Sequence, residues 1–361
     1  MTTGAAAFAA PHLLPPKASA IDDPYAPVKV SADRVMRTVV GLRPYRPTGF
    51  VLKRERIGRR TVVHNYGHGG CGVTLSWGCA QRAAALAAAA DGRRAVVLGA
   101  GVMGLTTAML LVRQGYQVTV YGADLPPHTT SNIAGAFWQP STLYDEAKVD
   151  DAFMAAFRDV ARASHRAFLH YVNNPYYGVW WIRLLELEKQ ASSAPAAERP
   201  EGSDLYPGAA AVSDPTRYFG YGRVVRYRSL MIDPDIFLFA LMRDIESAGG
   251  RIAQRRFERT GEVADLDCDV LINCAGLGAG ALFGDDELSP VSGQLTHLLP
   301  QPEIDYGYVE IRDGKELYML PRRGAILLGG SRKYGDGETA VDPEERTRML
   351  TGHADIAARM A

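Results

Sequence analysis

The sequence predicts an α/β fold with two domains, one of which is a Rossmann-like dinucleotide-binding domain. The first observation is a glycine fingerprint at 99–104, placed between an apolar strand at 95–98 and a helix at 103–114. The second is a further strand at 117–121, which completes a strand–helix–strand unit. The third is the β-rich segment 291–330, which predicts a second, sheet-based domain.

Each glycine of the fingerprint has a separate steric role. Gly99 permits the tight turn, Gly101 lets the backbone approach a pyrophosphate, and Gly104 lets helix and strand pack closely. Because the helix begins here, its free amides also favour phosphate. Asp124 follows about twenty residues later, at the distance expected of a ribose-binding carboxylate. The intervening residues of the predicted phosphate site are Ala100, Val102 and Met103.

The rest of the chain is read from periodicity and from caps. Asp233-Pro234 is a typical start for the helix predicted at 234–247. The segment 192–204 has loop composition, and residues 1–30 are an Ala/Pro-rich extension. Further strands are expected at 34–43, 61–65, 251–257, 270–274, 317–320 and 325–328, and further helices at 74–90, 150–170 and 342–361.

Composition limits the classes of partner. The 361 residues are 47% hydrophobic, and 40 Lys+Arg balance 40 Asp+Glu, so the charge favours neither nucleic acid nor a membrane surface. Four cysteines without CxxC spacing are typical of buried thiols in a reducing compartment, which predicts a cytoplasmic protein. His64 and His68 flank a glycine turn rather than share a helix face, so no metal site is expected.

The segment after Asp124 resembles the D-amino-acid oxidase family. Its Thr-rich turn, with Thr129, Thr130 and Ser131, resembles the pyrophosphate-binding turn of that family. The small-residue run that follows resembles the segment against the isoalloxazine ring, and comprises Gly135, Ala136 and Phe137. The resemblance implies FAD as the cofactor, and it disfavours an NAD-dependent dehydrogenase.

Four further blocks resemble the same family, at 270–282, 317–330, 40–47 and 64–74. Their order differs from that of the family, in which the last two blocks follow the fingerprint rather than precede it. This order predicts a circular permutation. The expected FAD-binding domain comprises 46–160 and 228–286, and the expected antiparallel β-rich substrate domain comprises 31–45, 161–227 and 287–361, with 1–30 as an extension.

The resemblance implies oxidative deamination of a D-amino acid to a 2-oxo acid, ammonia and hydrogen peroxide, through hydride transfer to flavin N5. Arg43 and Tyr318 would bind the substrate carboxylate, and the carbonyl of Gly70 would accept its amine. An amino acid and molecular oxygen are the expected partners, and a homodimer is one assembly that the sequence allows. The resemblance also implies FAD contacts from Phe257, Gly276, Gly69, Gly70, Cys71, Gly72, Val73 and Thr74.

The substrate side chain stays open at this point. Arg332 resembles the arginine that receives a side-chain carboxylate in the D-aspartate oxidase branch, which favours D-aspartate or D-glutamate. Ser141 stands where that branch has a histidine, and Gly314 stands where vertebrate members have a second tyrosine. The alternatives are a flavin amine oxidase for glycine, N-substituted glycine or a specialised amino acid, and an FAD-binding homologue without turnover.

Overall fold

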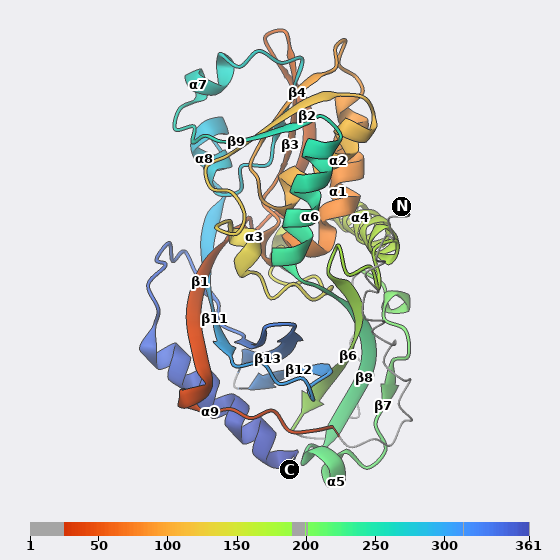
Figure 1. The fold of residues 1–361 in the computed structure, drawn as a ribbon, viewed down its shortest axis with the longest axis vertical. Helices are drawn as coiled ribbons and strands as arrows, with labels where there is room; N and C mark the ends of the chain where they lie inside the picture. The colour runs from red at the N-terminus through yellow and green to blue at the C-terminus, as the bar shows by residue number, and fades with distance from the viewer. Residues whose placement is uncertain (1–24, 190–198, 200, 313, 361) are drawn as a thin grey trace, which may run out of the picture.

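Two sheets lie end to end along the molecule in the computed structural model, which describes residues 25–189, 199, 201–312 and 314–360 (Figure 1). One sheet has six strands and the other has nine. Most of the expected extension and of the expected loop at 192–204 lies outside the described residues.

The six-stranded sheet has the order β2-β3-β10-β4-β5-β9, with every pair parallel except β2 with β3. Helices α1, α2 and α6 pack together on one face, and α7 and α8 pack on the other. Covered on both faces, the central strand β10 is buried throughout, and its residues are apolar except for Asn273. The elements are β2 (Val51–Ile57), β3 (Arg60–Tyr66), β4 (Arg94–Leu98), β5 (Gln117–Gly122), β9 (Arg251–Gln254), β10 (Val270–Asn273), α1 (Gly72–Ala87), α2 (Val102–Arg113), α6 (Pro234–Ser247), α7 (Thr260–Ala264) and α8 (Gly278–Phe283).

The nine-stranded sheet has the order β1-β11-β14-β13-β12-β6-β8-β7, with β15 paired to β11. All pairs are antiparallel except β12 with β6. Helix α9 packs across β11, β13 and β14, where it buries Met349 and Ile356. The elements are β1 (Val35–Tyr45), β6 (Val179–Glu188), β7 (Ala210–Ala211), β8 (Arg223–Ile232), β11 (Ser289–Leu298), β12 (Tyr306–Arg312), β13 (Lys315–Arg322), β14 (Ala325–Gly329), β15 (Lys333–Tyr334) and α9 (Pro343–Arg359).

The residues before the fingerprint belong to both sheets and form no separate domain, as the sequence predicts. β1 pairs with β11 from Val35 opposite Leu298 to Tyr45 opposite Ser289. β3 pairs in parallel with β10, directly beside the fingerprint strand β4. This early segment therefore contributes β1 to the nine-stranded sheet and both β2 and β3 to the six-stranded sheet.

The predicted elements around the fingerprint are confirmed within three residues at each end. The helix predicted at 150–170 is α4 (Asp151–Leu169), which Asp150 caps by accepting from the amide of Phe153 at 2.8 Å. Sequence reasoning missed β2, β6 and β8, and it predicted β12 only as part of the β-rich segment 291–330. β2 is a charged, exposed edge strand, and β6 alternates irregularly between buried and half-buried residues, so neither shows a clean period of two.

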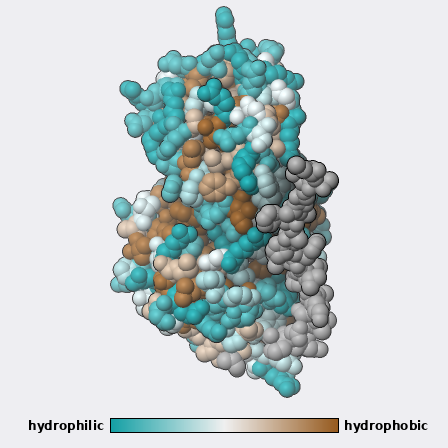
Figure 2. Space-filling model, in the orientation of Figure 1, coloured by the Kyte–Doolittle hydropathy of each residue, from teal (hydrophilic) through white to brown (hydrophobic). Residues whose placement is uncertain are grey.

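The two ends of the described chain meet on the outer face of the second sheet. The Tyr306 hydroxyl donates to the carbonyl of Ala26 at 2.8 Å and lies 3.8 Å from the sulfur of Met360. Val28 is buried in the same apolar cluster. The face shown in Figure 2 is largely hydrophilic over the six-stranded sheet, with apolar residues nearer the junction of the two sheets. Among the described helices, none has the length and hydrophobicity needed to cross a membrane.

Candidate active site

A cavity of about 410 Å³ lies between the two sheets. The six-stranded sheet contributes the carboxyl ends of β4, β5 and β10, where ligands of parallel α/β sheets bind. The nine-stranded sheet contributes residues of β1, β11 and β13. All of the predicted site residues line this cavity except Gly104 and Cys71, so the fold brings together segments from residue 41 to residue 332.

The turn between β4 and α2 has the tight geometry that its glycines predict. Gly99 has a φ of +104°, and a Cβ there would lie 2.2 Å from the carbonyl oxygen of Cys274. A Cβ on Gly104 would lie 1.8 Å from the carbonyl oxygen of Gly99. Gly104 therefore does not line the cavity. Its lack of a side chain lets α2 pack closely against the turn. Gly101 caps α2, so the positive end of this twelve-residue helix faces the cavity.

Thr129 and the start of the short helix α3 (Thr130–Ile133) face the same helix N-terminus. The Ser131 hydroxyl accepts from the amide of Val102 at 3.0 Å. The Thr129 hydroxyl donates to Asn132 at 2.7 Å, and Asn132 donates to Asp235 of α6 at 2.8 Å. These bonds hold hydroxyl groups beside free helix amides, which is a suitable donor set for a pyrophosphate.

The carboxyl end of β5 supplies a charged and aromatic corner. Asp124 lines the cavity and lies 3.5 Å from Arg256. The guanidinium carbon of Arg255 lies 4.5 Å from the ring centre of Phe257, and that ring packs edge-on against Tyr121. A carboxylate beside apolar rings suits a nucleoside, with its ribose hydroxyls and flat base. Sequence reasoning missed both arginines, although they stand immediately before Phe257 in the sequence.

Residues 134–137 form the wall between the two halves of the cavity. Ala136 is a non-glycine residue with a left-handed φ of +57°, which changes the direction of the backbone within this wall. A Cβ on Gly135 would lie 3.2 Å from the Tyr318 hydroxyl. Arg322 of β13 donates to the carbonyls of Ala134 and Gly135, and burial lowers the pKa of its guanidinium. The wall is thus fastened to the strand that carries Tyr318.

The segment before α1 forms another wall. Gly69 has a φ of +51°, and the amide of Gly70 donates to the carbonyl of Thr142 at 3.1 Å. The first residues of α1, at 72–74, line the cavity with the positive end of the sixteen-residue helix. Cys71 is buried and does not line the cavity. Its sulfur lies 2.9 Å from the backbone nitrogen and oxygen of Ser141, and burial raises its pKa to about 12.

Arg43 lies where the cavity meets the second sheet. Its Nη1 donates to the carbonyls of Ser331, at 3.3 Å, and Ser292, at 3.4 Å, and its guanidinium lies over Gly293. No carboxylate among the described residues pairs with it. Burial raises the pKa of Tyr318 and the charge of Arg43 lowers it, and both side chains line the same cavity. An unpaired guanidinium beside a protonated hydroxyl is a binding site for a carboxylate.

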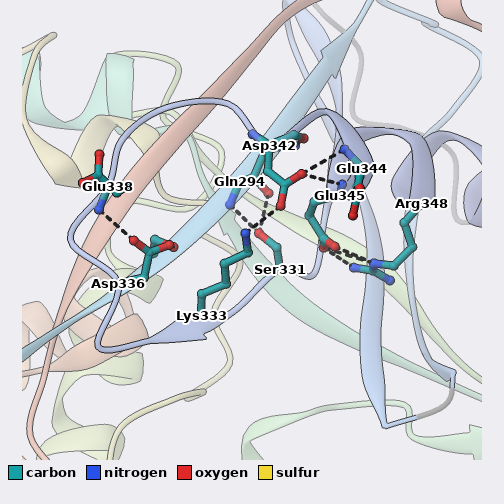
Figure 3. A network of polar contacts seen from close by, with 10 residues as sticks. Gln294, Ser331, Lys333, Asp336, Glu338, Asp342, Glu344, Glu345 and Arg348 are labelled. Atoms are coloured by element: carbon teal, nitrogen blue, oxygen red, sulfur yellow. Dashed lines mark hydrogen bonds and ion pairs between the residues drawn. The ribbon is translucent and has the colours of Figure 1, made fainter.

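A polar network holds the segment that supports Arg43 (Figure 3). The Ser331 hydroxyl accepts from the amide of Gln294. The side chain of Gln294 accepts from the amide of Asp342 at 2.9 Å and donates to its carbonyl at 3.2 Å. Asp342 also caps α9 and pairs with Lys333 at 2.6 Å. Residues 331–333 are therefore anchored to the start of α9.

Arg332 also lines the cavity, but it is already engaged. Its Nη2 forms an ion pair with Glu316 of β13. Sequence reasoning missed Glu316. The available signal was a carboxylate two residues before Tyr318, because residues i and i+2 of a strand share a face. Arg46, by contrast, is structural, since it pairs with Asp285 at 2.8 Å and Glu287 at 3.0 Å.

The donor set fits FAD. Two helix N-termini and a hydroxyl-bearing loop suit the pyrophosphate, Asp124 suits a ribose, and the wall at 134–137 suits a flat ring. No group of three His, Cys, Asp or Glu side chains among the described residues could hold a metal ion. Fold and cavity together define a dinucleotide-binding flavoprotein. More narrowly, the chain belongs to the DAO family of FAD-dependent oxidoreductases, which matches residues 21–86 and 94–357.

Curated relatives agree with this assignment, and a solved structure has a similar fold. The chain is 31% identical over 268 residues to a D-amino-acid oxidase of Streptomyces coelicolor, covering 74% of this chain and 78% of the relative. It is 28% identical over 272 residues to a human D-aspartate oxidase, covering 72% and 75%. A glycine oxidase structure from Geobacillus kaustophilus has 15% identity and a TM-score of 0.51 over 74% and 80% of the two chains, a likeness of fold alone.

Buried histidines predict acid sensitivity. Burial lowers the pKa of His68 and His353 to about 3 and that of His297 to about 4, whereas an unfolded chain protonates histidine near pH 6.5. Since the folded pKa values are depressed, the free energy of unfolding is highest above pH 6.5 and falls as the pH drops toward 4. Urea midpoints at pH 7.5, 6 and 5 measure this fall. For His68→Phe, which keeps a ring against Phe50, the urea midpoint should fall less steeply as the pH decreases. A slope equal to that of the wild type would contradict the contribution of His68 to acid sensitivity.

Proposed function

We propose that this protein oxidises a D-amino acid to the 2-oxo acid, ammonia and hydrogen peroxide. When bound, FAD would supply the redox chemistry, namely acceptance of a hydride from the substrate Cα and transfer of the electrons to molecular oxygen. The observation that carries the proposal is Arg43, a guanidinium without a carboxylate partner among the described residues, which lines the cofactor cavity together with Tyr318. The D-amino-acid oxidase relatives support the same substrate class.

The residues of the chain bind and orient the substrate. Arg43 would bind the α-carboxylate through parallel hydrogen bonds, and Tyr318 would donate a further one, because its raised pKa keeps the hydroxyl protonated. The carbonyl of Gly70 would accept the amine. The N-terminus of α1 places a positive dipole end at the cavity wall, where it would stabilise negative charge developing on the cofactor.

The decisive experiment compares enantiomers. Purified protein should show a flavin spectrum, and anaerobic addition of D-alanine, D-asparagine or D-aspartate should bleach it, whereas the L-enantiomers should not. Reduction by glycine or N-methylglycine alone would favour the amine oxidase alternative. Bound flavin that none of these compounds reduces would favour a homologue without turnover.

We also propose that the chain is a circular permutation of its family. Three observations support this: the family matches in two segments that meet near residue 90, β10 lies between β3 and β4 and pairs in parallel with both, and Ala26 and Met360 both contact Tyr306. Such proximity of chain ends is what permits rearrangement without loss of contacts.

Joining residue 361 to residue 1 and opening new ends between residues 91 and 92 tests the permutation. The rearranged protein should keep its flavin and its kcat/KM, because the break lies in a surface turn. A matched variant opened between residues 274 and 275, in the cavity wall, should lose flavin. Loss of flavin from both variants would contradict the proposal.

A further inference from the structure

We propose that Glu316 makes this site selective for D-amino acids with a carboxamide side chain, D-asparagine and D-glutamine, over their acidic counterparts. The inference rests on the proposed D-amino-acid oxidation and concerns only the substrate side chain. It also replaces the simplest interpretation of Arg332, namely that a free arginine receives a side-chain carboxylate.

The position of Glu316 places it at the substrate. Glu316 and Tyr318 occupy the same face of β13, and both line the cavity with Arg43. β13 pairs with β14 through Tyr318 opposite Gly329, so residues 316 and 332 lie at the same end of this hairpin. The charges of Glu316 and Arg332 both act on the Tyr318 hydroxyl, one raising and the other lowering its pKa. The pair is therefore close to the group that would bind the substrate carboxylate.

The pair leaves Arg332 neutralised. Glu316 is the carboxylate that pairs with Arg332 among the described residues, and its side chain is 14% exposed. A substrate carboxylate would face the guanidinium and the Glu316 carboxylate together. Removing Glu316 from the pair would leave a largely desolvated anion without a partner, which is unfavourable. A cationic side chain would meet the corresponding repulsion from Arg332.

A carboxamide matches both members of the pair. Its carbonyl oxygen accepts a hydrogen bond from a guanidinium, and its NH₂ group donates to a carboxylate. Asparagine and aspartate have almost the same shape, so the difference between them lies in this donor and in the added charge. Sites that hydrogen-bond a particular group strongly reject the analogue that lacks it, and a built-in repulsive charge adds to the discrimination.

The test compares isosteric substrates. Wild-type kcat/KM for D-asparagine should exceed that for D-aspartate by about 10–100-fold. Glu316→Gln should remove most of this ratio, chiefly by lowering KM for D-aspartate. Glu338→Gln removes the same charge from an exposed loop residue and should leave the ratio unchanged. Succinamate and succinate, which lack the amine, give the same comparison as a binding ratio through the flavin spectrum.

The outcomes separate this inference from the proposed function. Equal or greater kcat/KM for D-aspartate in the wild type, or an unchanged ratio in Glu316→Gln, would overturn the role of Glu316. If no D-amino acid reduces the flavin, the proposed function fails, and preference for succinamate over succinate then decides the role of Glu316 by itself. Retained flavin in Glu316→Gln and in Glu316→Ala shows that the variants are folded.

Discussion

Arg43→Met is expected to lower kcat/KM for the preferred D-amino acid by about 10²–10⁴-fold while FAD stays bound. Among the described residues, the guanidinium in the cavity has two backbone carbonyls as its hydrogen-bond partners, so its remaining donors are available to a substrate carboxylate. Without them the substrate loses both affinity and the orientation of its Cα–H bond. Stopped-flow reduction of the flavin measures the effect directly.

Two further variants serve as comparisons for the kcat/KM of Arg43→Met. Arg43→Lys keeps the charge but loses the planar fork of donors, so its kcat/KM should fall between those of the wild type and Arg43→Met. Arg37→Met removes an exposed arginine from the same strand and should leave kcat/KM unchanged. Loss of FAD from Arg43→Met, or an unaltered kcat/KM, would place the substrate carboxylate elsewhere.

Gly104→Ala is expected to release FAD and to lower the melting temperature. The new Cβ would lie 1.8 Å from the carbonyl oxygen of Gly99, and neither of the two backbones can give way without moving α2 from the turn. Overpacking of this kind costs about 1–3 kcal/mol, and more where the obstacle is backbone. The shift would also withdraw the helix amides from the pyrophosphate position. Flavin content after gel filtration and calorimetric Tm are the measurements.

Gly261→Ala is the matched control for Gly104→Ala. It adds the same methyl group to a helix, but no atom lies within 4 Å of the new Cβ. Its flavin content should match the wild type, and its Tm should stay the same or rise slightly, since alanine is the better helix former. Full flavin retention by Gly104→Ala would contradict this prediction and would mean that the turn is more flexible than its contacts indicate.

Local rules explain why the dinucleotide half was predictable. The fingerprint at 99–104, the cap at Asp233 and the apolar strands carry their conformations in their own sequence, because glycine geometry and capping act within a few residues. β6, β8 and β12 were not predictable in this way. β12 pairs with β6, which lies more than a hundred residues earlier in the sequence. In β6, charged residues also interrupt the alternation of buried and half-buried positions.

The sequence by itself determined the family resemblance, the cofactor class and about half of the residues that line the cavity, because these depend on residue types at fixed local spacing. Tertiary structure decided which charges meet. Arg43 remains without a carboxylate among the described residues, Arg46 is held by Asp285, and Arg332 is neutralised by Glu316. The physical reason is that charges interact over a few ångströms in space, and only strand register and the packing of the two sheets set those distances.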